Sequence, residues 1–209
     1  MTTEAETPFL SGAPWRKRAL GALAENVIAH ADELTALDSA IGDGDHGHNM
    51  KRGFEAVLVS LDAFSQMELP ELLKAVGMKL VSTVGGASGP LYGTLFMALG
   101  KALPPHPTRA QAADAFEQAI AAVKARGKSD VGQKTMLDVL APALEAFRDG
   151  ADAEGFAAAA DRAADATKPM RATRGRASFL GERSIGHIDP GARSSALMIA
   201  SLCESWRQS

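Results

Sequence analysis

The chain of 209 residues contains little cysteine, few aromatic side chains and no long apolar run. Its one cysteine, Cys203, excludes an intrachain disulfide framework and a cysteine-based zinc site, and its helical surroundings predict a buried, inert thiol. Aromatic residues make up 5% of the chain, which leaves little material for base-stacking platforms or an all-β sandwich. No apolar run approaches the roughly 20 residues that span a bilayer.

The net charge is also small, since 22 Lys and Arg residues stand against 25 Asp and Glu residues to give −3. Such a chain has no overall field that attracts nucleic acid or anionic lipid, so we expect no nucleic-acid partner and no membrane association. Residues 1–14 contain acidic residues and no basic start. We therefore expect a short N-terminal extension rather than a secretory signal, and a cytoplasmic location.

Apolar residues recur with a 3.6-residue period along most of the chain, which predicts amphipathic helices. The predicted helices cover residues 15–35, about 47–63, a segment opened by Pro70, a segment after the glycines at 85–89, a segment after the capping box Thr108–Gln111, about 134–148 with an interruption at Pro142, 152–167 and about 191–206. No stretch alternates as a half-buried strand would. We therefore expect an all-α bundle of about eight antiparallel helices, with one domain over residues 15–209. Residues 168–190 lack a clear period and are expected to form a functional loop or a disordered one.

The segment between the first two predicted helices is acidic, with Asp38, Asp43 and Asp45 interspersed with glycines. Carboxylates this close repel one another unless a cation neutralises them, and hard oxygen ligands indicate Mg²⁺ or Ca²⁺ rather than zinc. A solvated acidic turn with Asp caps explains the same residues equally well. An EF-hand does not, because Phe54 stands where a loop counted from Asp43 needs its bidentate Glu.

A glycine-rich turn at Val84–Pro90 directly precedes a predicted helix. Glycines let the backbone approach a ligand, and the first N–H groups of a helix bind anions. A tight interhelical turn is the simpler explanation of this segment. A Rossmann fingerprint is weak here, because the spacing is not G-x-G-x-x-G and no strand comes before it.

Two basic segments complete the pattern. Residues 126–136 nearly match a Walker A loop, but Gln133 separates the second glycine from Lys134 and no strand leads in, so we reject a P-loop fold. A position beside phosphate for Gly127, Lys134 or Thr135 stays open. Residues 168–193 hold six basic residues against two acids, which suits either a solvated face or a loop that closes over phosphate. The segments together supply oxygen ligands for a metal, a glycine-lined helix N-terminus and a basic flap, which are the parts that phosphoryl transfer requires.

Taken in order, these motifs resemble the nucleotide-binding L subunit of dihydroxyacetone kinase. The resemblance spans roughly residues 15 to 206 and rests on Asp38-x4-Asp43-Gly-Asp45-His46-Gly47, Gly85–Pro90, Gly132-Gln-Lys134-Thr135-Met136-x-Asp138 and Gly175–Ala192. It implies a closed barrel of antiparallel amphipathic helices with the nucleotide at one end.

The resemblance also implies roles for individual residues. Asp38, Asp43 and Asp45 correspond to the ligands of a pair of Mg²⁺ ions and, with Arg176, to the catalytic residues. The residues that correspond to contacts with the ADP or ATP cofactor are His46, Gly47, His48, Asn49, Ala87, Ser88, Gly127, Met136, Arg176, Asp189, Pro190 and Gly191. Ala87 and Ser88 would contact phosphate, whereas Gly127 and Met136 would border the adenine.

In this family a separate K subunit holds the ketose through a covalent link to a histidine, and nothing in this chain resembles that domain. The resemblance thus implies a kinase subunit that is active only with a K subunit. Some members use exchangeable ATP, whereas others keep ADP bound and recharge it from a phosphohistidine-carrying M subunit of the phosphoenolpyruvate-dependent phosphotransferase system. We favour the second mode.

Several alternatives remain: a subunit of an ATP-dependent kinase of dihydroxyacetone or a related ketose or polyol, a non-catalytic nucleotide-binding regulator, and a metal-stabilised bundle without nucleotide. The glycine and arginine loops argue against the last. A phosphohistidine on His46, His48 or His187 is disfavoured, because metal and nucleotide already account for the chemistry. The sequence leaves a homodimer open.

Overall fold

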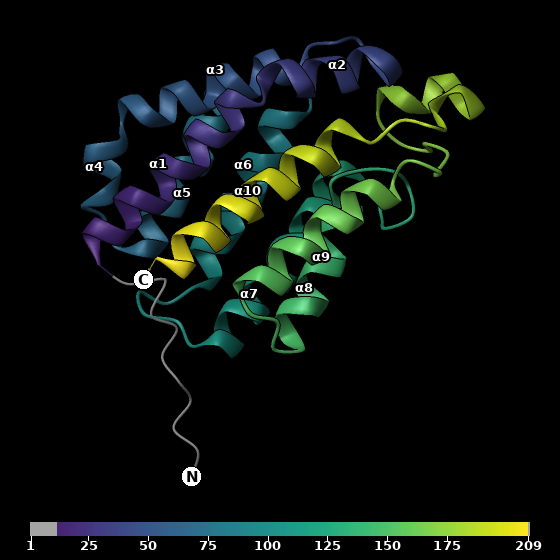
Figure 1. Ribbon diagram of the computed structural model, residues 1–209. Coiled ribbons are helices and arrows are strands. Elements are labelled where there is room, and N and C mark those ends of the chain that lie inside the picture. Colours follow the sequence, from purple (N-terminus) through teal and green to yellow (C-terminus); the bar gives the residue numbers. More distant parts are fainter. Residues whose placement is uncertain (1–11, 209) are drawn as a thin grey trace.

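The computed structural model describes residues 12–208, and no strand forms among them. The helices are α1 Ala13–Ala29, α2 Ala31–Ile41, α3 His46–Val59, α4 Leu61–Ser65, α5 Leu69–Thr83, α6 Ser88–Ala102, α7 Arg109–Gly127, α8 Leu137–Arg148, α9 Ala153–Ala166, the 3-10 helix η2 Arg176–Ser184 and α10 Pro190–Arg207 (Figure 1). The predicted all-α class is confirmed. Apart from residues 12–14, the predicted extension 1–14 lies outside the described residues, and α1 already begins at Ala13.

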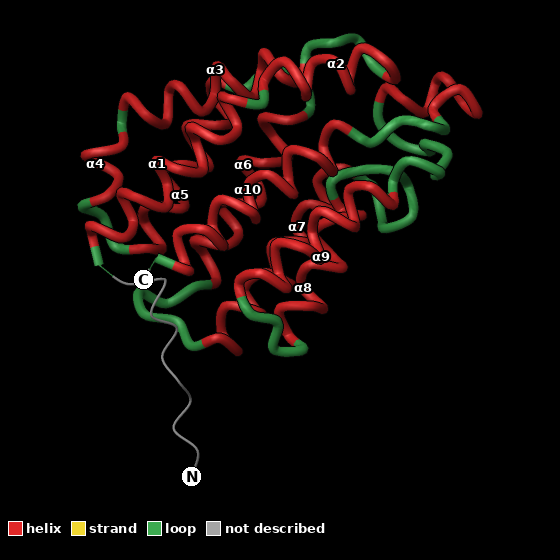
Figure 2. The backbone as a smooth tube through the Cα atoms, in the orientation of Figure 1, coloured by secondary structure: helices red, strands yellow, loops and turns green. Residues whose placement is uncertain are grey.

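Within residues 12–208, eight of these helices form a closed ring. Each contacts the next in the order α1, α3, α5, α6, α7, α8, α9, α10, and α10 returns to α1. The tube in Figure 2 shows the long helices side by side, with α2 continuing past one end of the ring, where it contacts α3, α10 and η2. The predicted barrel is therefore confirmed. None of the helices in the described part of the chain is long and apolar enough to cross a membrane.

Two helices that the period predicts as single are broken. The chain leaves helical geometry at His30, between α1 and α2, and again at Ser60, between α3 and α4. At the first break the His30 backbone N–H donates to Asn26 O, and its ring Nδ1 lies 2.8 Å from the same oxygen. Because each break occupies one residue, the apolar stripe resumes in phase and the periodicity does not reveal it.

The predicted interruption at Pro142 is wrong. Helix α8 runs through Pro142 from Leu137 to Arg148. The proline lies on the exposed face of the helix and costs one backbone hydrogen bond, and burial of Leu140, Ala143 and Leu144 on the other face offsets that cost. This helix also starts later than predicted. Lys134 has a left-handed φ of 62°, which an α-helix cannot contain, so α8 begins only at Leu137. The predicted capping box is confirmed, with Thr108 and Gln111 bonded reciprocally.

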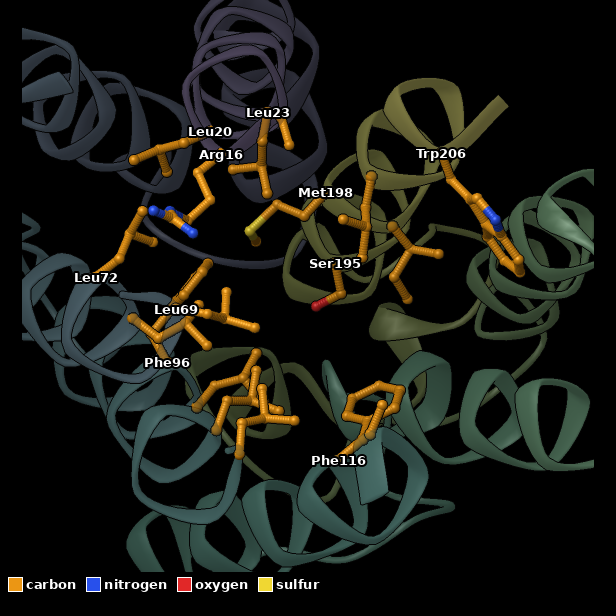
Figure 3. Close-up of a pocket in the computed structure, with 18 of the residues that line it drawn as sticks. Arg16, Leu20, Leu23, Leu69, Leu72, Phe96, Phe116, Ser195, Met198 and Trp206 are labelled. Carbon is orange, nitrogen blue, oxygen red and sulfur yellow. The ribbon is translucent and has the colours of Figure 1, made fainter. Parts of the chain in front are cut away.

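The middle of the barrel is apolar and contains a cavity of about 210 Å³. Figure 3 shows side chains from several helices turned toward it, with the Arg16 guanidinium among them. Arg16 Nε donates to Ser65 O at 3.3 Å. Tyr92 lines both this cavity and a second one at the end of the barrel, and so lies in the wall between them. The thiol of Cys203 is buried, as predicted, and burial raises its pKa to about 12.

Candidate active site

The four motif-bearing segments meet at the end of the barrel where α2 and η2 lie (Figure 1). They surround a cavity of about 410 Å³. The predicted site residues that line it are Asp38, Asp43, Asp45, His46, Ala87, Ser88, Gly127, Met136, Arg176, Asp189, Pro190 and Gly191. Residues as far apart in the sequence as Asp38 and Gly191 thus form one site.

The three aspartates converge in this cavity. One oxygen from each of Asp38, Asp43 and Asp45 lies within 4.8 Å of the others. Asp38 is buried, and its Oδ2 accepts the backbone N–H groups of Asp45 at 2.8 Å and His46 at 3.1 Å. A Cβ on Gly42 would come within 2.1 Å of Asp38 Oδ1, so the glycine leaves room for this carboxylate. Three hard oxygens at this separation fit a Mg²⁺ ligand set.

His46 joins three helices behind the carboxylates. Its Nδ1 lies 3.0 Å from Ser88 Oγ on α6, and its Nε2 lies 2.9 Å from Ser194 Oγ on α10. Burial lowers the pKa of His46, against the opposing effect of Asp38 and Asp45, so the ring is neutral near pH 7. Tyr92 extends the network, with its hydroxyl 2.6 Å from Ser194 Oγ, and burial raises its pKa. This network fixes the start of α6 and of α10 at the cavity.

The glycine turn packs against α3 before it enters α6. A Cβ on Gly85 would lie 2.5 Å from Asn49 Oδ1, and Gly86 has a left-handed φ of 62°. The turn brings Ala87 and Ser88 to the cavity at the N-terminus of α6. Helix N-termini present unpaired N–H groups and a positive dipole end, which together suit an anion such as phosphate.

Three of the predicted contact residues do not line the cavity. Gly47 faces α2, where a Cβ would come within 2.0 Å of Ala31 O, so it permits close helix packing. His48 is exposed, with Nδ1 3.2 Å from Thr35 Oγ1. Asn49 lies under the glycine turn and accepts from Arg52 Nη2 at 2.9 Å. The physical reason is that α3 begins at His46, and each further residue turns by about 100° around the helix axis.

Three arginines also line the cavity. Arg176 Nε lies 3.1 Å from Asp43 Oδ2, and the side chains are 68% and 36% exposed, respectively. Arg126 and Arg174 also line the cavity, and Arg174 Nε donates to Gln133 Oε1 at 3.3 Å. Neither of these two had an assigned role from the sequence, although both lie in the segments selected for their basic character. Three guanidinium groups and three carboxylates thus line one cavity, and guanidinium groups bind the oxygens of a metal-bound polyphosphate well.

The start of α10 closes the cavity. Asp189 caps this helix, with Oδ2 accepting the Ala192 N–H at 2.7 Å. Burial raises the pKa of Asp189 to about 7; Asp138 acts in the same direction, while the Ala192 N–H and Lys134 oppose it. Pro190 and Gly191 line the cavity next to it. Lys134 is buried, and its ammonium group donates to backbone carbonyls.

Comparison with known proteins shows the family of the chain. A family model described as the DAK2 domain matches residues 40–204. The chain belongs to the DAK2-domain family. This DAK2 domain is 42% identical over 192 residues to a Listeria innocua protein named PEP-dependent dihydroxyacetone kinase 1, ADP-binding subunit DhaL, a match that covers 91% of this chain and 96% of the relative. It is also 42% identical over 182 residues to the PEP-dependent dihydroxyacetone kinase, ADP-binding subunit DhaL, of Escherichia coli, covering 82% of this chain and 87% of that one.

A solved structure shares the fold of this DAK2 domain. The dihydroxyacetone kinase of C. freundii, in complex with AMP-PNP and Mg²⁺, matches with a TM-score of 0.75 and 26% identity over 93% of this chain. The match covers 34% of that chain, so the DAK2 domain described here spans about a third of the kinase.

Proposed function

We propose that the chain is the ADP-binding subunit of a dihydroxyacetone kinase. It would hold the nucleotide with Mg²⁺ in the cavity at the end of the barrel and donate a phosphoryl group to a ketose on a separate K subunit. The observation that carries this proposal is the grouping of three aspartate oxygens within 4.8 Å in the same cavity as the N-terminus of α6 and Arg176. The relatives named as ADP-binding subunits support it over nearly their whole length.

The chemistry follows from the residues around the cavity. Asp38, Asp43 and Asp45 would hold the magnesium, for which we expect two ions. Bound Mg²⁺ neutralises phosphate oxygens and orients the transferring phosphoryl group. The N–H groups at the start of α6 and the Ser88 hydroxyl would bind phosphate oxygens. Arg176, at the rim, would stabilise the charge that spreads over the phosphoryl group during transfer.

A direct transfer, without a phosphohistidine on this chain, is supported by the position of His46. Both of its ring nitrogens lie within hydrogen-bonding distance of serine hydroxyls, and the ring is buried. His48 is exposed but does not line the cavity. We therefore propose that the nucleotide itself carries the phosphoryl group to the acceptor, and that the K subunit supplies any base for the ketose hydroxyl.

For the source of the phosphoryl group we propose bound ADP that an M subunit recharges from its phosphohistidine, in line with the PEP-dependent relatives. The alternative is exchangeable ATP, in line with the C. freundii kinase that was solved with AMP-PNP. Mass analysis of small molecules released from the purified, denatured chain tests the choice. One ADP per chain is expected, and an empty chain that turns over free ATP when a K subunit is added would favour the alternative.

A regulatory role without turnover is the second class of function. Its signature would be tight ADP binding with no product when K subunit, M subunit and dihydroxyacetone are all supplied. The homodimer and the cytoplasmic location stay predictions, for which sedimentation of the purified chain and localisation of a tagged chain are the direct measurements.

A further inference from the structure

Lys134 has an unusual environment for a lysine. Its side chain is 1% exposed, and its Nζ donates to the carbonyl oxygens of Met170 at 3.1 Å, Ser184 at 2.7 Å and His187 at 2.6 Å. An ammonium group has three N–H donors, so these bonds use its full capacity. The resemblance of this segment to a Walker A loop is therefore misleading, because the ammonium binds backbone rather than facing a phosphate.

The three carbonyls belong to one segment, residues 168–189, which we call the strap. The strap carries Arg174 and Arg176 to the wall of the cavity. Two hydrogen bonds join the two ends of the strap. The backbone N–H of Asp189 donates to Thr167 Oγ1 at 3.0 Å, and that of Gly186 donates to Lys168 O at 2.8 Å.

Apart from Ile188 near its end, which packs against the main core, little apolar packing holds the strap. Ala172 and Ala177, with Leu180 beside them, form a small cluster with Ile41 that is separate from the main core. The strap also makes polar contacts with the loop before α8. In one of them, the backbone N–H of Thr173 donates to Gln133 O at 3.3 Å. Lys134 contributes the greatest number of these contacts, and it reaches both limbs of the strap, at Met170 on one side and at Ser184 and His187 on the other.

We infer that Lys134 is a positioning residue: its ammonium group ties the two limbs of the strap together and so holds Arg176 against the nucleotide cavity. The kinetic part of this inference rests on the proposed function, whereas the structural part does not. Removing the ammonium leaves three carbonyls without their shared donor, and the strap then lacks the apolar burial that would keep it closed.

The structural part is tested by the rate at which an arginine-specific protease cuts the strap, with the fragments identified by mass. Lys134→Met keeps the length of the side chain and removes the charge, and it destroys no cleavage site for this protease. We expect cleavage after Arg171, Arg174, Arg176 or Arg183 to be roughly tenfold faster or more than in the wild type, with the helical circular dichroism retained.

The matched control is Lys128→Met. Lys128 also has a left-handed backbone, with φ 48°, and lies in the same interhelical loop, but it is exposed. It should leave the cleavage rate unchanged. If Lys134→Met fails to fold, Lys134→Gln, which keeps two N–H donors, should show an intermediate rate. The inference would be overturned if the folded Lys134 variant were cleaved at the wild-type rate. It would also be overturned if the Lys128 variant were cleaved as fast as the Lys134 variant.

The kinetic part is tested by a double-mutant cycle in the reconstituted kinase. Lys134→Met and Arg176→Ala should each lower kcat at saturating nucleotide by roughly tenfold or more, and the double variant should be no slower than the slower single variant. If the fold-losses in kcat of the two single variants multiplied in the double variant, Lys134 would not act through Arg176, and the inference would be contradicted. A wild-type chain that binds no nucleotide would instead contradict the proposed function, while the protease result would still decide the role of Lys134.

Discussion

Asp38 on α2 caps the neighbouring helix α3: its Oδ2 lies 2.8 Å from the backbone nitrogen of Asp45, and the side chain of Asp45, the helix's own N-cap residue, makes no capping bond in the described structure. One carboxylate therefore both closes the acidic loop and takes part in the acidic cluster. The Asp45 carboxylate makes no capping bond to α3 and is therefore available for a cation.

Because Asp38 caps α3 and Asp43 does not, we expect their substitutions to change the free energy of unfolding by different amounts. Without Mg²⁺, Asp38→Ala should lower the free energy of unfolding by about 1 kcal/mol, because the buried N–H group of His46 and the partly buried one of Asp45 lose their acceptor. Asp43→Ala should change it by less than about 0.5 kcal/mol, since Asp43 is exposed. Urea unfolding in EDTA measures both variants. Equal losses would show that the Asp38 bonds do not stabilise α3.

Asp189 predicts a pH dependence of stability. Its pKa is raised from 3.8 to about 7 in the folded chain, so the folded state keeps the proton after the unfolded chain has released it. The contribution of Asp189 to the free energy of unfolding therefore falls between about pH 4 and about pH 7, by up to about 1.4 kcal/mol per pH unit. Above about pH 7 it stays constant. Asp189→Asn keeps a capping side chain and removes the titration.

The free energy of unfolding of Asp189→Asn relative to the wild type should therefore rise between pH 4 and 7 and then level off. Urea unfolding of both proteins across this range measures the difference, in which the other carboxylates cancel. A difference that does not vary with pH would mean that Asp189 ionises normally in the folded chain.

Phe179 predicts where the K subunit docks. It lies on η2, next to the cavity-lining residues Arg176 and Ala177, and its side chain is 89% exposed. Under the proposed function, the acceptor ketose reaches the nucleotide from outside, so a large exposed aromatic beside the cavity is placed to become buried against the subunit that carries the ketose. Phe179→Ser should weaken binding of the K subunit by roughly tenfold or more, and should leave ADP binding unchanged.

Val59, which is also 89% exposed but lies at the end of α3, provides the control. Calorimetric titration of the K subunit into the Val59→Ser variant should give the wild-type affinity. If the two serine variants bind the K subunit equally well, η2 does not form part of the interface.

The sequence predicted the parts of the site that depend on local composition. Asp38 lies in the last turn of α2, Asp43 and Asp45 follow it, and Gly85 and Gly86 come directly before α6, so these residues all lie at junctions between helices that meet at one end of the barrel. The breaks at His30 and Ser60 escaped prediction, because a single residue outside helical geometry does not shift the period.

The role of Lys134 could not be predicted either. Its three acceptors lie 36 to 53 positions away in the chain, and backbone carbonyls leave no mark in a sequence. The same limit applies to Gly47, His48 and Asn49, where the resemblance indicates proximity to the nucleotide but the exact start of α3 decides which side chains face the cavity.

The central claim is that the three aspartates bind nucleotide through Mg²⁺. Calorimetric titration of ADP into nucleotide-stripped chain, with Mg²⁺ and with EDTA, tests it for the wild type, for Asp45→Asn and for Asp32→Asn, an exposed acid on the same helix as Asp38. We predict that EDTA weakens wild-type and Asp32→Asn binding by roughly tenfold or more, and that Asp45→Asn binds weakly in both conditions. Wild-type, Mg²⁺-dependent affinity in Asp45→Asn, or wild-type binding that is indifferent to Mg²⁺, would contradict the claim.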